Sequence, residues 1–225
     1  MRRIRLSARP SRRYARHSRP VLATALALAG LGAGLVATAP TAQAAPPTPP
    51  SAATARTMLA GLTVDGEDSL SGYDRDLFPH WISQGDSCNT REIVLQRDGS
   101  GVVTDSECRA VSGRWYSQYD GVTLYDSSGI DIDHVVPLAE AWRSGAHSWS
   151  WSKRRSFANN LSAAQLIAVS ASSNRSKGDR DPAEWLPRSA YHCLYARSWV
   201  WVKNNYAMKV DPAEKSALSA ILNRC

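Results

Sequence analysis

The chain has 225 residues, with 27 Lys and Arg, 20 Asp and Glu, and four cysteines. Its formal net charge of +7 suggests a basic protein, but residues 1–44 hold eight of the bases and none of the acids. The remaining 181 residues carry 19 bases and 20 acids. This length suits one domain with a core, and the charge balance excludes any argument for nucleic-acid binding from overall basicity.

Residues 1–44 have the organisation of an export signal. An Arg-rich stretch at 1–20 precedes an apolar stretch at 21–39, and Ala42-Gln43-Ala44 supplies small residues for signal peptidase. A membrane anchor is the alternative, and the glycines of the apolar stretch favour cleavage. We expect a secreted protein, exported by the Sec or the twin-arginine route, with no membrane attachment afterwards. Residues 45–55 predict a Pro-rich disordered linker, and residues 56–225 a single domain.

The four cysteines all follow the predicted leader. An even number in an exported protein predicts two disulfides, for which three pairings are possible. The local pairing Cys88–Cys108 and Cys193–Cys225 is favoured, because each pair brackets one compact segment. Zinc binding is disfavoured by the absence of a C-x-x-C spacing.

The first half of the predicted domain reads as a short helix and a β-hairpin. Asn89 and Glu92 form a capping-box pattern that opens a helix, and Asp98-Gly99 marks its end. Residues 114–119 and 122–125 predict two strands joined by a tight turn. A second turn at 126–129 leads into an extended segment at 130–136.

The second half predicts one buried strand among helices. Residues 165–169, QLIAV, are short, apolar and β-branched, which is typical of a buried strand. A turn or helix start is expected at 174–178, and Asp181 and Asp211 each begin an N-cap pattern with proline in the first turn. Helices are expected at 137–143, 152–160, 190–206 and 213–222. The fold class is therefore α+β.

Charge is distributed unevenly between the two halves. Residues 45–130 hold 6 bases and 12 acids, whereas residues 131–225 hold 13 bases and 8 acids. A polyanionic substrate would lie against the second half. Solvated helix faces would give the same composition, and composition alone does not decide between the two.

The chemistry-bearing residues gather in two short motifs. Residues 130–138, IDIDHVVPL, alternate apolar and acidic side chains up to Asp133 and His134, and Pro137 favours a bend after them. Forty residues after His134, Asn174 opens the sequence NRSKGD behind the predicted buried strand. Each motif alone is weak, but their combination and spacing are specific.

Together these motifs resemble the HNH, or His-Me finger, nucleases. The resemblance is closest to a secreted actinobacterial HNH family related to the C-terminal domain of GmrSD-type restriction enzymes. It is strongest over residues 130–187 and extends loosely back to about Tyr73, through the segments FPHW and TRE. It implies a ββα-metal core with additional helices and the hairpin region before it, and a metal-dependent endonuclease that leaves 5′-phosphate and 3′-hydroxyl ends.

The resemblance also implies roles for four residues. Asp133 and Asn174 would be the metal ligands, and His134 the general base. The middle Asn of the family motif is replaced by Gln165, whose amide could still hold the loop of the base; Asn159 or Asn160 could serve instead. Separately from the family, Asn174 could also be a helix N-cap.

Physical chemistry supports the same roles. A neutral imidazole can take a proton from water near pH 7. A carboxylate and an amide oxygen suit Mg²⁺, or another divalent cation such as Mn²⁺, better than Zn²⁺. Lys177, Arg175 and Arg180 are expected to contact phosphates, and Arg91 is a further candidate.

We therefore predict a secreted, monomeric endonuclease of low sequence specificity that hydrolyses DNA, with RNA as a second candidate substrate. One alternative is a non-catalytic nucleic-acid-binding module on a degenerate HNH scaffold, with Gln165 as the sign of decay. Another is an esterase that pairs His134 with a serine, although no G-x-S-x-G motif occurs. The numerous tryptophans suggest base stacking, but most should belong to the core.

Overall fold

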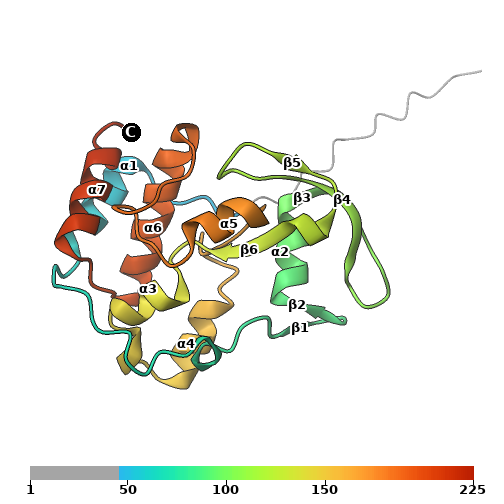
Figure 1. The fold of residues 1–225 in the computed structure, drawn as a ribbon, viewed down its shortest axis with the longest axis horizontal. Helices are drawn as coiled ribbons and strands as arrows, with labels where there is room; N and C mark the ends of the chain where they lie inside the picture. Colours follow the sequence, from blue (N-terminus) through green and yellow to red (C-terminus); the bar gives the residue numbers. More distant parts are fainter. Residues whose placement is uncertain (1–45) are drawn as a thin grey trace, which may run out of the picture. The chain divides into compact units, whose positions relative to one another are not determined.

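The computed structural model describes residues 46–225, which lie in one compact unit with a mixed α+β fold (Figure 1). The predicted fold class is confirmed, whereas the predicted leader lies outside the described residues. The helices are α1 (Ala52–Gly61), α2 (Thr90–Asp98), α3 (Leu138–Arg143), α4 (Trp151–Ala158), α5 (Ala171–Lys177), α6 (His192–Tyr206) and α7 (Pro212–Leu222), with short 3₁₀ turns η1 (Arg75–Leu77), η2 (Ser127–Gly129), η3 (Ala146–Ser148) and η4 (Ser189–Tyr191). The strands are β1 (Ser83–Gly85), β2 (Cys88–Asn89), β3 (Gly99–Thr104), β4 (Ala110–Tyr116), β5 (Thr123–Leu124), β6 (Ile130–His134) and β7 (Leu166–Ser170).

Strands β6 and β7 form the antiparallel pair on which the site is built. Their register runs from Ile130 opposite Ser170 to His134 opposite Leu166. Helix α5 follows β7 without a loop, because the Ser170 side chain caps it by accepting a hydrogen bond from Ser173 N at 3.2 Å. Figure 1 shows α5 alongside β6. Asn174 therefore lies inside this helix and not at its N-cap.

The two faces of the β6–β7 pair belong to different apolar clusters, as the two-residue period of a strand requires. Ile130 and Ile132 pack in a smaller cluster with Leu95 of α2 and Trp115 of β4. On β7, Val169 belongs instead to a larger cluster that also contains residues of α1, α3, α4, α6 and α7. The catalytic candidates at the end of β6 are thus held between two cores.

The remaining strands form two small antiparallel sheets. Strands β3, β4 and β5 pair in that order, and β1 pairs with β2. The predicted hairpin corresponds to β4 and β5, with Trp115 opposite Leu124. The Asn89 capping box of α2 is also present, with Glu92 accepting from the Asn89 backbone N at 3.1 Å.

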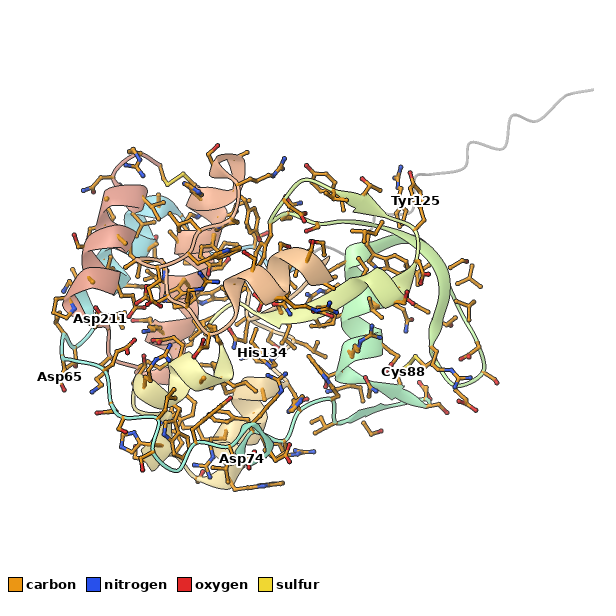
Figure 2. The ribbon with its side chains drawn as sticks, viewed as in Figure 1. Asp65, Asp74, Cys88, Tyr125, His134 and Asp211 are labelled. Carbon is orange, nitrogen blue, oxygen red and sulfur yellow. A yellow bond between two sulfur atoms is a disulfide. The ribbon has the colours of Figure 1, made fainter. Side chains whose placement is uncertain are left out.

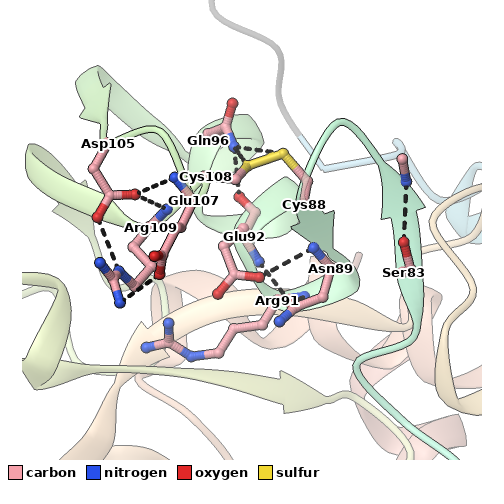
Figure 3. The surroundings of a disulfide bond; sticks show 11 residues. Ser83, Cys88, Asn89, Arg91, Glu92, Gln96, Asp105, Glu107, Cys108 and Arg109 are labelled. Carbon is pink, nitrogen blue, oxygen red and sulfur yellow. Dashed lines mark hydrogen bonds and ion pairs between the residues drawn. A yellow bond between two sulfur atoms is a disulfide. The ribbon is translucent and has the colours of Figure 1, made fainter.

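Both disulfides join the cysteines that the local pairing predicted. Cys88–Cys108 has a Cα–Cα distance of 5.1 Å and Cys193–Cys225 one of 5.7 Å. Figure 3 shows the first of them beside helix α2, where it ties β2 to the connection between β3 and β4. The second ties the start of α6 to the last residue of the chain.

The Pro-rich segment differs from the prediction of a disordered linker. Pro49 is buried, and the Arg197 guanidinium of α6 donates to the carbonyl oxygens of Pro49 at 2.8 Å and Pro50 at 2.5 Å. Helix α1 begins at Ala52, after Ser51 as its N-cap. Proline lacks a backbone donor but keeps its acceptor, and one arginine fork binds two successive carbonyls. Composition alone did not reveal this partner.

Only one of the two predicted N-cap patterns with proline in the first turn begins a helix. Asp181 accepts from the backbone N of Ala183 and Glu184 as an N-cap would, but a turn follows in place of a helix. Asp211 does cap a helix, α7.

Within residues 46–225, no helix combines the length and the hydropathy that a membrane crossing needs.

Candidate active site

A polar cavity of about 260 Å³ opens at the end of strand β6. Its walls come from β6, the start of α3, helix α5 and the segment that contains η1. In Figure 2, His134 lies between α5 and the segment that carries Asp74. The lining residues include three of the four predicted catalytic and metal-binding residues, namely Asp133, His134 and Asn174.

The imidazole of His134 is fixed in orientation. Its Nε2 lies 2.9 Å from the Ala158 carbonyl oxygen, which can only accept, so Nε2 carries the proton and Nδ1 keeps a lone pair. The rings of Trp81 and Phe157 lie nearly parallel to it, with centroids 5.5 and 6.5 Å away. Only 4% of His134 is exposed, and this burial lowers the pKa of the imidazole to about 3. At neutral pH it is therefore an uncharged proton acceptor.

Asn159 at the end of α4 holds the chain segment that covers His134. Its Nδ2 donates to the Pro79 carbonyl oxygen at 2.7 Å, and its Oδ1 accepts from Ile82 N at 3.1 Å and Thr90 Oγ1 at 2.8 Å. Trp81 lies between these two anchoring points with a φ of 57°, a left-handed conformation that is costly for a bulky residue. The Asn159 bonds hold Trp81 in this conformation over the imidazole.

Asp133 is engaged by two buried partners. Lys177 Nζ lies 2.9 Å from its Oδ1 and 2.8 Å from its Oδ2, and the Tyr119 hydroxyl donates to Oδ2 at 2.6 Å. The third ammonium proton of Lys177 goes to the His134 carbonyl oxygen at 2.8 Å. Burial raises the pKa of Asp133, and the charge and hydrogen bonds of Lys177 oppose that shift. Burial likewise lowers the pKa of Lys177, and the charge and hydrogen bonds of Asp133 oppose that shift.

Asn174 extends from α5 toward β6. Its Nδ2 donates to Asp131 Oδ2 at 3.0 Å, while its Oδ1 makes no hydrogen bond within residues 46–225. A carboxylate has about four acceptor positions, and three of those on Asp133 are used, which leaves one on Oδ1. Free acceptors on Asp133 and Asn174 at one cavity are a donor set that fits a hard divalent cation.

Gln165 binds the loop that follows the base. Its Oε1 accepts from Val136 N at 3.1 Å and its Nε2 donates to the Val136 carbonyl oxygen at 2.9 Å, in a side chain that is 0% exposed. Both functions of the amide are therefore used two residues after His134. Asn160, one of the alternatives, instead donates to the Tyr206 hydroxyl at 2.8 Å; Asn159 acts on the segment over the ring.

The four basic residues expected at phosphates lie in different surroundings. Arg175 is exposed and lines the cavity. Lys177 is 0% exposed, so the structure gives it an internal ion pair in place of a phosphate contact. Arg180 is exposed, and its Nε donates to the Lys177 carbonyl oxygen at 3.1 Å at the end of α5. Arg91 donates to the Ile130 carbonyl oxygen at 3.2 Å at the start of β6 and does not line the cavity.

Sequence reasoning missed four residues at this site. Asp131 was noted only as part of the alternating strand, and Trp81 only inside the FPHW segment. Tyr119 was the last residue of the first strand of the predicted hairpin, and Arg75 belonged to no motif. An additional signal for Asp131 was available, because it shares a strand face with Asp133.

Comparisons with known proteins identify a family for this chain. Residues 95–221 match the family described as GmrSD restriction endonucleases, C-terminal domain. Over 199 residues the chain is 52% identical to an uncharacterized secreted protein of Arthroderma benhamiae (strain ATCC MYA-4681 / CBS 112371). The matched region covers 88% of this chain and 98% of that protein. No solved structure matches the chain. The predicted secretion is confirmed, and the chain belongs to the family of GmrSD restriction endonuclease C-terminal domains.

Proposed function

We propose that this secreted protein is a metal-dependent endonuclease of the HNH type in which His134 is the general base. The observation that carries the proposal is the state of the imidazole. Nε2 donates to the Ala158 carbonyl oxygen, which leaves Nδ1 unprotonated, and His134 lines the same cavity as Asp133 and Asn174. Membership of a restriction endonuclease family supports phosphodiester hydrolysis as the reaction.

The proposed mechanism assigns each residue one task. His134 Nδ1 removes a proton from the attacking water, and the Ala158 carbonyl oxygen stabilises the resulting imidazolium through Nε2. Asp133 Oδ1 and Asn174 Oδ1 would hold Mg²⁺ or Mn²⁺. When bound, this cation would stabilise charge on the phosphate oxygens and the departing 3′-oxygen. Lys177 offsets part of the cost of burying the Asp133 carboxylate.

The lowered pKa of His134 favours the neutral imidazole and disfavours the imidazolium that forms when it accepts a proton. Burial keeps the imidazole neutral at physiological pH, so the acceptor form is fully populated. The same burial makes the imidazolium unfavourable until a negative charge enters the cavity. The negative charge of a bound phosphodiester would favour the imidazolium, whereas the proposed cation would disfavour it.

The proposed ββα-metal core corresponds to β6, β7 and α5. The proposed base His134 and the proposed ligand Asp133 then lie at the end of β6, and the second ligand Asn174 lies in α5, directly after β7. We propose DNA as substrate, with RNA as a second candidate, cleaved with low sequence specificity to 5′-phosphate and 3′-hydroxyl ends.

Supercoiled plasmid incubated with the secreted protein tests this function. With Mg²⁺ or Mn²⁺ we expect nicked and linear products, and with EDTA none. His134→Ala should lower the nicking rate by at least about 100-fold at an unchanged melting temperature, as expected for loss of a general base. Absence of metal-dependent nicking by the wild-type protein with both cations would contradict the nuclease assignment.

One observation favours a non-catalytic binding module as the second candidate. The Asp133 carboxylate already has three of its four acceptor positions occupied. Gln165, however, makes two hydrogen bonds to Val136, which supports an orienting role for its amide. A module of this kind would bind an oligonucleotide with equal affinity in Mg²⁺ and EDTA and cleave it in neither.

A further inference from the structure

The cavity has a second wall that comes from outside the family match. Tyr73 and Arg75 line it together with Asp133, His134 and Arg175. The family match begins at residue 95, so this wall is contributed by a segment that the match does not include. The side chain of Arg75 is exposed and makes no hydrogen bond or ion pair with any of residues 46–225.

The backbone below Arg75 is firmly anchored. Asp74 Oδ1 accepts from Asp76 N at 2.9 Å and so caps the η1 turn. Phe78, directly after the turn, is 0% exposed in the larger apolar cluster. The carbonyl oxygen of Leu77 accepts from Arg154 Nε of α4 at 3.0 Å. Because the main chain around Arg75 is already fixed, little backbone freedom is lost when its guanidinium binds a ligand.

The charges that line the cavity do not cancel. Asp133 is paired with Lys177 at 2.8 Å, and Asp179 is paired with Arg143 at 3.0 Å. His134 holds its proton on Nε2, where it faces the Ala158 carbonyl oxygen at 2.9 Å. Among the Asp, Glu, Lys and Arg side chains that line the cavity, Arg75 and Arg175 alone lack an ion pair within the described residues, and both are positive. The cavity is therefore suited to an anion.

We propose that Arg75 binds a phosphate of the substrate from the wall opposite α5, so that Arg75 and Arg175 hold the polynucleotide backbone from two sides. This inference rests on the proposed nuclease function. A guanidinium presents a planar fork of donors that matches two phosphate oxygens, which a lysine ammonium does not reproduce. Arg75 would position the scissile phosphate in front of His134 and take no part in proton transfer.

The test measures binding separately from cleavage. In the His134→Ala background, a fluorescent 20-base-pair duplex is titrated by anisotropy at several salt concentrations in Ca²⁺ buffer. Adding Arg75→Ala should weaken binding about 10- to 100-fold, as expected for loss of a bidentate charged contact. The slope of log K against log salt should fall by about one unit. Arg75→Lys should recover only part of the affinity.

The matched control is Arg114→Ala, which removes an exposed arginine of β4 that does not line the cavity. It should leave affinity and salt slope unchanged. In the otherwise wild-type protein, Arg75→Ala should raise KM for plasmid nicking. Because Arg75 is exposed, the melting temperature should not move, and circular dichroism checks that each variant is folded.

The outcomes separate the two proposals. If the wild-type protein nicks DNA and Arg75→Ala binds and nicks like Arg114→Ala, the Arg75 proposal is wrong and the nuclease stands. If the wild-type protein does not nick DNA, the nuclease is wrong, and binding of the duplex then decides about Arg75 by itself. Loss of affinity on Arg75→Ala alone would support it, and equal loss with Arg114→Ala would overturn it.

Discussion

Lys177 Nζ lies 2.8 Å from Asp133 Oδ2, and the two side chains neutralise each other in a region where both are almost completely buried. The same ammonium donates to the His134 carbonyl oxygen. One lysine thus stabilises the carboxylate proposed as a metal ligand and the backbone of the proposed base. Its contribution is electrostatic and positional, and it makes no contact with solvent.

Replacing Lys177 by methionine should be strongly destabilising. The variant leaves the Asp133 charge buried with only the Tyr119 hydroxyl as partner, which should lower the free energy of unfolding by about 3–5 kcal/mol. Urea denaturation measures this loss. The double variant Lys177→Met, Asp133→Asn removes both charges and should recover more than half of it. A double variant no more stable than the single one would show that the loss comes from packing instead.

Gln165→Asn, which restores the amide found in the family motif, should impair this protein. The Gln165 side chain reaches both Val136 N and the Val136 carbonyl oxygen, and an asparagine is one methylene shorter. Loss of these buried bonds should cost about 1–3 kcal/mol of stability and lower the nicking rate. Thermal denaturation and plasmid nicking measure the two effects. An increase in both would mean that the loop prefers the shorter side chain.

The stability of the fold should depend on the ionisation of Asp181. Carboxylate oxygens of Asp181, Glu67 and Asp211 lie within 4.8 Å of one another. Burial, followed by repulsion from Glu140 and Asp211, raises the pKa of Asp181 from 3.8 to about 6. The folded state therefore binds this proton more tightly than the unfolded chain, so stability falls as pH rises from about 4 to 6.

Asp181→Asn removes that titration while keeping the N-cap acceptor. At pH 7.5 the variant should be more stable than the wild-type protein by about 1–3 kcal/mol, and at pH 4 the difference should vanish. Chemical denaturation at the two pH values measures both. An equal effect at both pH values would mean that Asp181 does not titrate in this range.

The disulfide between Cys193 and Cys225 should stabilise the helical part of the fold. It closes a loop with a sequence separation of 32 between the start of α6 and the chain end. Replacing both cysteines by alanine should lower the free energy of unfolding by about 3–4 kcal/mol through the entropy of the unfolded chain. Urea denaturation of this variant, beside the wild-type protein with and without reductant, measures the effect.

Residue type and spacing were enough to predict which residues lie together at the cavity, but not which of their neighbours are buried. His134, Asp133 and Asn174 line one cavity, and Gln165 holds the loop after the base. Lys177 was predicted to contact phosphates because a lysine in the polar run NRSKGD is typical of an exposed side chain. In α5, however, Lys177 lies four residues after the buried Ser173 and so shares its inward face.

Other features had no local signal. Arg75 reaches the cavity because Phe78 docks in the larger apolar cluster, and this long-range contact fixes the direction of the turn before it. The Pro-rich segment is ordered because Arg197, almost 150 residues later, binds its carbonyl oxygens. The secondary structure of the second half was easier, since caps and apolar periodicity are local properties.

The contacts of strand β6 depend on its length. Ile130 and Ile132 point into one apolar cluster, while Asp131 and Asp133 point away from it. A single inserted residue after Ile130 would rotate every later side chain by half a turn, bringing carboxylates toward Trp115 and isoleucine toward Lys177. Relatives should therefore differ here by substitutions and place their insertions and deletions in the connections on either side.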